Sequence, residues 1–459
     1  MSQDLSRRDL MAGAAAAALA AGLPASALAQ NTGQTPRLRS APGSAYDVRT
    51  PKLEKVRLGF IGMGARGPSH LDASMNCEGV EIVAIADPHV PSANKGAKMT
   101  TNKGRPAPKL YTNGDRDYER MLGENKLDAV FISTPWDWHV PQAVACMKAG
   151  AHALVEVPAA LTLEGCWELV ETAEATQRHC MMLENVNYGR EELMVLNMCR
   201  LGLFGELLHG EAAYIHDLRW QMKEIEHGTG SWRTYHYTKH NGNLYPTHGL
   251  GPVAWYMDIN RGDRLDFMSS VSCPARARAI YAKQEFPEGH ERRSLRFTCG
   301  DLNTSIAQTV RGKTLMIQWD EQLPRPYTRH NLIQGTRGVW GGFPARVAIE
   351  GVTKEFESWT QGAAVGEFFT KYDHPLWKKL EVEAKRHGGH GGMDFVMVWR
   401  IIYCLRNGLP LDQDVYDAAA WSAVTPLSEI SVANRGRSVD FPDFTRGKWR
   451  TMKPVDLNN

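Results

Sequence analysis

The chain has 459 residues, of which 43% are hydrophobic and 23% charged, enough apolar material for two or three folded domains. Its formal net charge of +2 excludes the strongly basic surface that nucleic-acid binding favours. The eight cysteines form no CxxC pair, which argues against a disulfide framework or a zinc site and predicts mostly buried free thiols.

The first residues have the composition of an export signal. Ser6-Arg7-Arg8-Asp9-Leu10 precedes an Ala-rich run from 11 to 23, and Ala27-Leu28-Ala29 offers a small-residue cleavage site. The run is too short to span a bilayer, so 1–29 is predicted to be a signal peptide and 30–54 an N-terminal arm. The paired arginines predict twin-arginine export to the periplasm or beyond. No cysteine lies near the cleavage site, so no membrane anchor is expected.

Residues 55–186 alternate short apolar strands with helices, which predicts a parallel, doubly wound sheet. The predicted strands are 56–61, 80–86, 129–133, 153–157 and 180–183. The predicted helices are 117–122, 140–149 and 163–178. This part is therefore expected to be a Rossmann domain.

Residues 187–434 contain longer runs in which apolar and polar residues alternate, as in an antiparallel sheet with one wet face. The predicted strands are 207–215, 267–272, 295–299, 305–310 and 314–319, and the predicted helices are 191–200, 249–259, 394–406 and 415–432. The expected fold class is α/β: a Rossmann doubly wound parallel sheet plus a C-terminal α/β domain with an open, mainly antiparallel sheet. A C-terminal arm is expected over 435–459, and a broad open sheet favours a homo-oligomer.

A G-x-G-x-x-G loop, Gly62-Met63-Gly64-Ala65-Arg66-Gly67, follows the first predicted strand and opens a helix. In that context the glycines allow a tight turn and a close approach of the backbone to a pyrophosphate, which the helix N-terminus attracts. Asp87 ends the next strand, twenty residues after Gly67, where a carboxylate accepts hydrogen bonds from an adenosine ribose. This arrangement predicts NAD rather than NADP, although Arg66 within the loop could bind a 2′-phosphate.

At this point the chain resembles the Gfo/Idh/MocA oxidoreductase superfamily over essentially its whole mature length. The resemblance rests on the Gly-rich loop, Asp87-Pro88, Ser133-Thr134-Pro135 followed by His139, and Glu156-Val157-Pro158, in that order. Typical dehydrogenases of the superfamily carry Glu-Lys-Pro at the last of these positions. Because Val157 cannot move a proton, simple alcohol oxidation is not expected.

A closer resemblance is to glycoside hydrolase family 109. It rests on Glu156-Val157-Pro158, the segments 181–188, 230–234 and 244–252, and Pro326-Tyr327. The resemblance implies α-N-acetylgalactosaminidase activity on glycans with terminal N-acetylgalactosamine, with NAD retained through each turnover. The implied sugar contacts are Glu156, Tyr188, Arg233, Tyr245, His248 and Tyr327. The implied cofactor contacts are the loop Gly62 to Gly67 together with Asp87, Thr134, Pro135, Trp136, His139, Glu156 and Asn185.

The resemblance also implies a redox route: oxidation at C3, elimination, water addition and re-reduction, in place of the usual pair of carboxylates. A group near the C3 hydroxyl must accept a proton, and His248 or Tyr245 fits that role. A tyrosine of lowered pKa is a candidate base at C2, so Tyr188 and Tyr245 join His248 as predicted catalytic residues. Which of them is the base, the anomeric preference, and the choice among N-acetylhexosamines stay open.

Each of these positions also has a purely structural interpretation. Tyr245 and His248 fit a turn and helix start, Arg233 an ion pair, Glu156 a cap or a partner of Lys148, and Tyr327 a solvated loop. The string His387-Gly-Gly-His390-Gly-Gly lacks a third ligand and predicts a Gly-rich start to a helix, so no metal is expected. Two rival functions are a sugar dehydrogenase, which would accumulate NADH, and an exported glycan-binding protein that no longer binds NAD.

Overall fold

The computed structural model describes residues 43–354 and 357–458. The predicted signal peptide, and the predicted arm up to residue 42, lie outside the described residues. The described residues belong to one compact unit. None of the described helices is long and apolar enough to cross a membrane.

The first sheet has six parallel strands in the order β3-β2-β1-β4-β5-β6. The strands are β1 Val56–Ile61, β2 Val80–Ala86, β3 Lys109–Tyr111, β4 Ala129–Ile132, β5 His152–Val155 and β6 Cys180–Met182. They are rich in apolar residues because helices cover both faces of such a sheet. The strand order reverses between β1 and β4, and ligands bind at that crevice in this fold. The expected Rossmann sheet is confirmed.

Five α-helices connect these strands. They are α2 Gly67–Met75, α3 Val90–Asn102, α4 Asp117–Glu124, α5 His139–Lys148 and α6 Leu163–Thr176. The short 3₁₀ helix η2, Trp136–Trp138, precedes α5. α6 shows how local chemistry sets its limits: the Thr162 side chain accepts a hydrogen bond from the Gly165 N–H, and Gln177 ends the helix in the left-handed conformation at φ 51°.

The second sheet has nine strands in the order β14-β13-β12-β11-β7-β10-β9-β8-β15. They are β7 Leu207–Ile215, β8 Leu265–Ser272, β9 Asn303–Thr309, β10 Thr314–Asp320, β11 Leu332–Gly335, β12 Gly338–Gly341, β13 Arg346–Ile349, β14 Thr360–Gln361 and β15 Val439–Asp440. β7 and β10 pair in parallel, and the other neighbours are antiparallel. The expected open, mainly antiparallel sheet is confirmed.

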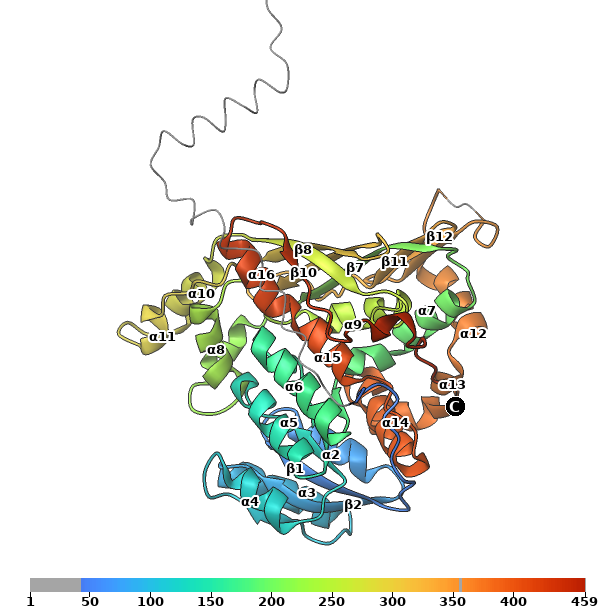
Figure 1. Ribbon diagram of the computed structural model, residues 1–459. Helices are drawn as coiled ribbons and strands as arrows, with labels where there is room; N and C mark the ends of the chain where they lie inside the picture. Colours follow the sequence, from blue (N-terminus) through green and yellow to red (C-terminus); the bar gives the residue numbers. More distant parts are fainter. Residues whose placement is uncertain (1–42, 355–356, 459) are drawn as a thin grey trace, which may run out of the picture. The chain divides into compact units, whose positions relative to one another are not determined.

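Helices of the C-terminal half contact both sheets. They are α7 Arg190–Arg200, α8 Thr229–Lys239, α9 Thr247–Tyr256, α10 Ala277–Glu285, α11 Glu291–Ser294, α12 Gly366–Tyr372, α13 Pro375–His387, α14 Met393–Asn407, α15 Val415–Ser422 and α16 Val424–Ala433. α9 packs on β7, whereas α14 packs on α2 and α15 packs on α6 (Figure 1). The residues that follow β6 therefore also help to cover the first sheet.

Three expectations need correction. Residues 295–299 alternate like a strand but are not one, because the N–H groups of Thr298 and Cys299 both donate to the Tyr237 carbonyl oxygen at 3.1 Å, beside α8. The helix predicted over 415–432 is two helices, α15 and α16. The predicted C-terminal arm packs against the protein: β15 pairs with β8, and Phe441 and Trp449 are buried.

Candidate active site

The glycine-rich loop joins β1 to α2 at the carboxyl end of the first sheet. A Cβ on Gly67 would lie 2.1 Å from the carbonyl oxygen of Gly62, so no larger residue fits there. A Cβ on Gly64 would meet no atom within 4 Å, because Gly64 lines an open cleft. The backbone N–H groups of Gly64, Ala65 and Arg66 have no backbone acceptor among the described residues, which leaves them free for phosphate oxygens.

Asp87, just after β2, lines the same cleft. Its Oδ2 accepts a hydrogen bond from the Met63 N–H at 2.7 Å, and its Oδ1 accepts one from the His89 N–H at 2.8 Å. Each carboxylate oxygen has a second acceptor site, which suits a ribose hydroxyl. The guanidinium of Arg66 is bonded to Glu156 and Asp394 and so is not available for a 2′-phosphate. These residues fit NAD rather than NADP.

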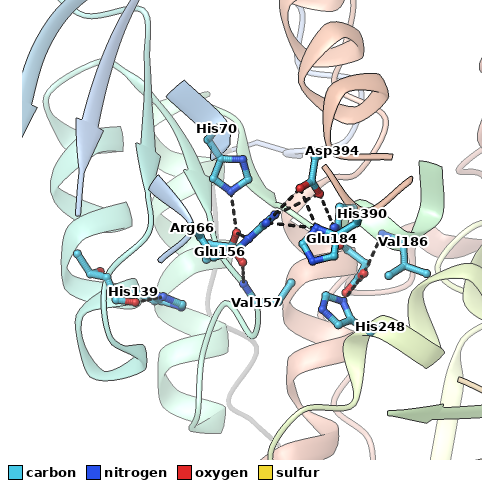
Figure 2. A network of polar contacts seen from close by, with 12 residues as sticks. Arg66, His70, His139, Glu156, Val157, Glu184, Val186, His248, His390 and Asp394 are labelled. Atoms are coloured by element: carbon cyan, nitrogen blue, oxygen red, sulfur yellow. Dashed lines mark hydrogen bonds and ion pairs between the residues drawn. The ribbon is translucent and has the colours of Figure 1, made fainter. Parts of the chain in front are cut away.

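Arg66, whose side chain is 27% exposed, is the centre of an ionic network with two buried carboxylates (Figure 2). Its Nε donates to Glu156 Oε1 at 3.0 Å, and its two terminal nitrogens donate to Asp394 at 3.1 and 3.2 Å. His70 Nε2 lies 2.7 Å from the same Glu156 oxygen. Burial opposes ionisation of Glu156, but Arg66 and His70 outweigh it and hold the pKa of Glu156 below its usual range. Asp394 also has a lowered pKa, because His390 and Arg66 outweigh its burial.

The other end of the cleft is aromatic. The Arg233 guanidinium carbon lies 4.7 Å from the ring centre of Trp136 and 4.9 Å from that of Tyr245, and all three residues line the cleft. Arg233 also donates to Glu321 Oε1 at 3.3 Å. Burial alone would lower the pKa of Arg233, but Glu321 and the surrounding tyrosines together outweigh it and raise the pKa. The guanidinium of Arg233 is suited to bind sugar hydroxyls, and the aromatic rings around it are suited to pack against the apolar face of a sugar ring.

His248 stands behind this aromatic wall. α9 begins at Thr247, so Tyr245 lies in the preceding turn and His248 in the first helical turn, as the structural interpretation expected. The ring centres of Tyr245 and His248 are nevertheless 5.0 Å apart, although His248 itself does not line the cleft. His248 Nδ1 lies 2.7 Å from Oε1 of the buried Glu184 (Figure 2). His248 therefore belongs to the start of α9 and also contacts Tyr245, a residue of the cleft lining.

The structure brings most of the predicted site residues to this one cleft. Those that line it are Gly62, Gly64, Ala65, Arg66, Asp87, Thr134, Pro135, Trp136, His139, Glu156, Arg233 and Tyr245. Both ring nitrogens of His139 lie against carbonyl oxygens, at 2.7 Å from Pro158 and 2.9 Å from Thr134. Burial lowers the pKa of His139 and the two carbonyl contacts oppose this only in part, while the same contacts hold the ring in the cleft wall.

Two predicted contact residues are buried and do not line the cleft. Tyr188 is 0% exposed, and its hydroxyl donates to Asp412 at 3.1 Å, so it cannot touch a sugar in this conformation. Asn185 is buried, and its Nδ2 donates to Asp394 at 2.5 Å. Both residues follow β6, but the short helix η3, Asn185–Tyr188, turns them into the protein.

Besides His248, three further predicted residues lie next to the cleft without lining it. Met63 is buried and contributes its N–H to Asp87, and Gly67 serves the close packing of the loop. Tyr327 is 39% exposed and accepts a hydrogen bond from Arg329 at 2.8 Å, as expected for a solvated loop. Its ring centre lies 6.1 Å from that of Tyr214, which in turn contacts Tyr245. Tyr327 thus continues the aromatic wall outward.

The expectation of a tyrosine with a lowered pKa is wrong for this conformation. Burial raises the pKa of Tyr245, and Arg233 opposes this only in part. Burial and then Asp412 raise the pKa of Tyr188 well above its ordinary value. Neither phenol is prepared to act as a base here.

Sequence reasoning missed three polar residues of the site: His70, Glu184 and Asp394. A signal existed for two of them, because His70 lies one turn after Gly67 and Glu184 falls within the 181–188 segment. The two histidines of the glycine-rich string have other partners: His387 contacts Glu383 at 3.0 Å, and His390 contacts Asp394 at 2.8 Å. In the described part of the chain, no group of three ligating side chains could hold a metal ion.

Comparison with known proteins assigns the two halves separately. Residues 56–184 match the model of an oxidoreductase family with an NAD-binding Rossmann fold, and residues 188–451 match the C-terminal domain of glycosyl hydrolase 109. A family 109 protein of Shewanella sp. strain MR-7 is 56% identical over 448 residues, covering 96% of this chain and 97% of that protein. A protein of Shewanella oneidensis named alpha-N-acetylgalactosaminidase is 56% identical over 447 residues, with the same coverage.

Solved structures agree on the fold. A levoglucosan dehydrogenase in complex with NADH and levoglucosan superposes with a TM-score of 0.62 at 16% identity, over 85% of this chain and 100% of that chain. An NAD binding oxidoreductase from Klebsiella pneumoniae superposes with a TM-score of 0.62 at 16% identity, over 84% of this chain and 99% of that chain. The chain is thus an NAD-binding enzyme of Gfo/Idh/MocA architecture, and it belongs to glycosyl hydrolase family 109.

Proposed function

We propose that this chain is an exo-glycosidase that removes terminal α-linked N-acetylgalactosamine from glycans. One observation carries the proposal: the cofactor loop and the Arg233–Trp136–Tyr245 group line the same cleft. A sugar held by that group lies within reach of the nicotinamide end of a dinucleotide. The 56% identity to a protein named alpha-N-acetylgalactosaminidase supports the choice of sugar and anomer.

The side chains at the aromatic end bind and orient the sugar. Bound NAD would supply the redox chemistry, accepting a hydride from the sugar and returning it within one turnover. Arg233 offers several donors to hydroxyls or to the N-acetyl carbonyl. Trp136 and Tyr245 offer ring faces and exclude water, which strengthens the polar contacts between them.

Proton transfer falls to a small number of groups. His248 lies directly behind Tyr245, a residue of the cleft lining, and is the histidine we assign to accept a proton from the substrate. Arg66 keeps Glu156 ionised, so Glu156 can accept a hydrogen bond from a sugar hydroxyl. Val157 lines the cleft beside Glu156 and has no proton to exchange, which disfavours net sugar oxidation.

The test uses the purified chain with an aryl α-N-acetylgalactosaminide in D₂O. We expect release of the aryl group, deuterium at C2 of the sugar product, and no accumulation of NADH. The β-linked substrate and the glucose-configured N-acetylhexosaminide are run beside it to define anomer and sugar. NADH accumulation with free sugars and no aryl release would instead establish a dehydrogenase, and loss of NAD binding would leave only a glycan-binding protein.

We also propose that the chain is exported by the twin-arginine pathway and acts in the periplasm or outside the cell. Ser6-Arg7-Arg8 and the apolar run after it support this. Replacing both arginines with lysine should retain the protein in the cytoplasm. Self-association also stays a prediction, supported by the exposed Val271 and Ile306 on β8 and β9, and the mass of the purified protein in solution tests it.

A further inference from the structure

Glu184 and His248 form a pair whose partners come from the two halves of the chain. Glu184 follows β6 of the first sheet, and His248 lies in the first turn of α9, which packs on the second sheet. His248 Nδ1 and Glu184 Oε1 are 2.7 Å apart. Glu184 has 0% of its side chain exposed and His248 has 15%. The Glu184 carboxylate is therefore fully buried, whereas the His248 imidazole is partly accessible to solvent.

Two glycines make this approach possible. A Cβ on Gly249 would lie 2.3 Å from the backbone nitrogen of Ala213, so α9 sits directly on β7. A Cβ on Gly251 would lie 2.8 Å from Cγ of Glu184. The Gly249-Leu250-Gly251 string thus allows α9 to press His248 between β7 and the buried carboxylate.

The second bond to Glu184 decides which nitrogen of His248 holds the proton. Oε1 also accepts a hydrogen bond from the Val186 N–H at 3.2 Å (Figure 2). An ionised carboxylate can only accept, so Nδ1 of His248 must donate to it. In the neutral ring the proton then resides on Nδ1, and Nε2 carries the free lone pair. Among the described residues, Nε2 has no hydrogen-bond partner.

Two other histidines, His139 in the cleft lining and His70 beside it, lack this combination. His89 and His227 also line the cleft, but they stack on each other and contact Ser92. Both nitrogens of His139 face carbonyl oxygens, and the ring is 1% exposed. His70 is 0% exposed, and its Nε2 is hydrogen-bonded to Glu156. A base needs a free nitrogen and an approach for the proton it takes, and of His70, His139 and His248 only His248 has both an unpartnered ring nitrogen and a partly exposed side chain.

We propose that Glu184 is the positioning residue of the active site: it fixes His248 with Nε2 unprotonated and stabilises the imidazolium that forms when Nε2 takes a proton from the substrate. This inference rests on the proposed function. In that step the substrate O–H bond breaks, an N–H bond forms at Nε2, and the new positive charge lies against the Glu184 carboxylate. A carboxylate that orients a histidine base in this way is a recurrent catalytic arrangement.

The kinetic test is Glu184→Gln. The amide oxygen of glutamine can accept from both Val186 and His248, so the ring keeps its place while the negative charge is lost. We expect kcat to fall by about 10²-fold, the lower end of what a positioned base contributes, with KM within about threefold. The matched control is Glu429→Gln, because Glu429 Oε1 likewise accepts from His240 Nδ1 at 2.8 Å and from a backbone N–H, that of Asn241, at 3.1 Å, outside the cleft. The control should leave kcat unchanged.

A spectroscopic test does not depend on turnover. Long-range ¹H–¹⁵N correlations of the histidine rings, with His248 assigned by its absence in His248→Gln, report which nitrogen is protonated. We expect the Nδ1–H form in the unmodified protein and in Glu184→Gln. An Nε2–H form in the unmodified protein, or a kcat of Glu184→Gln within threefold of the unmodified enzyme, overturns the proposal. If the chain cleaves no N-acetylgalactosaminide, the proposed function fails and the protonation of His248 alone decides the role of Glu184.

Discussion

Arg66 of the cofactor loop donates from Nε to Oε1 of Glu156 at 3.0 Å, and so joins the turn after β1 to the turn after β5. The same guanidinium reaches Asp394 on α14. One half-buried cation thus connects the two strand ends that border the cleft with a helix of the C-terminal half. Arg66, the loop residue that could have bound the 2′-phosphate of NADP, is instead bonded to these two carboxylates.

Glu156→Gln should weaken this network and change its response to acid. The pKa of Glu156 is lowered in the folded protein from an ordinary value of 4.5, so its stabilising effect is full above that pH and is lost as the pH falls toward the folded pKa. At pH 7 we expect the variant to lose about 1–3 kcal/mol, less than a fully broken buried pair because Arg66 keeps Asp394. Urea unfolding from pH 7 to pH 3 measures this.

The difference between Glu156→Gln and the unmodified chain should shrink steadily below about pH 4.5, because the glutamate itself becomes protonated in the unfolded state. Glu119→Gln is the control: Glu119 pairs with Arg116 on the surface, and such pairs add little. A difference that stays constant from pH 7 to pH 3 would show that Glu156 stabilises by shape and not by charge.

The sequence was most informative where a residue's surroundings are set by its own element. β1, β2 and β7 have the predicted bounds, since a buried strand needs an unbroken or alternating apolar pattern that periodicity reveals. The strands β11, β12 and β13 were missed because each has only four residues, too few to show an alternating apolar pattern, and two of the four residues in β12 are glycine. The run at 295–299 alternates correctly but bonds to the end of α8, which no local pattern encodes.

The residues of the site also divide into those that local sequence pattern locates and those that depend on distant partners. The glycine loop and Asp87 could be located because their spacing follows from the strand–turn–helix geometry that holds a dinucleotide. The partners Glu184 for His248 and Asp394 for Arg66 lie 64 and 328 residues away along the chain, and a single sequence does not pair them. Tyr188 was misplaced for a related reason: its string matches the family, but whether its hydroxyl faces the cleft depends on Asp412, which binds it from a distant segment.

Arg233→Lys should impair substrate binding while keeping the positive charge. Lysine loses the planar fork that stacks between Trp136 and Tyr245, and such contacts contribute about 0.5–2 kcal/mol. We expect kcat/KM to fall about 10-fold on an aryl N-acetylgalactosaminide, mainly through KM.

The control for Arg233→Lys is Arg278→Lys, which changes another buried arginine stacked on a ring, 3.7 Å from Tyr237 and outside the cleft. The control should lower the unfolding temperature without raising KM. Equal effects of the two variants on KM would mean that Arg233 is only a structural ion-pair partner of Glu321.

Asp87→Asn should reduce the NAD that stays with the protein. Asparagine has one acceptor oxygen for the N–H groups of Met63 and His89 and no charge for the ribose hydroxyl. Loss of a hydrogen bond to a charged group costs about 1.5–3 kcal/mol, so NAD affinity should fall by at least 10-fold. NAD released on denaturing the dialysed protein is quantified per chain.

Asp128→Asn is the matched control for the cofactor site. Asp128 accepts from the Arg57 N–H at 2.8 Å near the start of β1, so it has a similar backbone role and does not line the cleft. It should destabilise the fold and leave the NAD content unchanged. If both variants lose NAD equally, Asp87 acts through the stability of the sheet and not through the ribose.

Glu191→Gln should stabilise the protein at alkaline pH. Glu191, on α7, is largely buried, and burial followed by the charge of Glu192 raises its pKa to about 7. Between pH 4.5 and 7 the folded chain holds a proton that the unfolded chain releases, so stability falls as the pH rises through this window. Glutamine can still accept from Asn331 Nδ2, now bonded at 3.0 Å, and never ionises. We expect a gain of about 1–3 kcal/mol at pH 8 that vanishes near pH 4.5.

The neighbouring Glu192→Gln should have the opposite effect, although the two carboxyls are adjacent in sequence. Glu192 forms a buried ion pair with Arg329, so its removal leaves that cation with too few partners and should cost about 3 kcal/mol at pH 7. Urea unfolding of both variants at pH 5 and pH 8 separates the two cases. If Glu191→Gln destabilises at pH 8, the Glu191 carboxylate is ionised and needed by Asn331 and Trp340, and its burial is not the dominant influence on its charge.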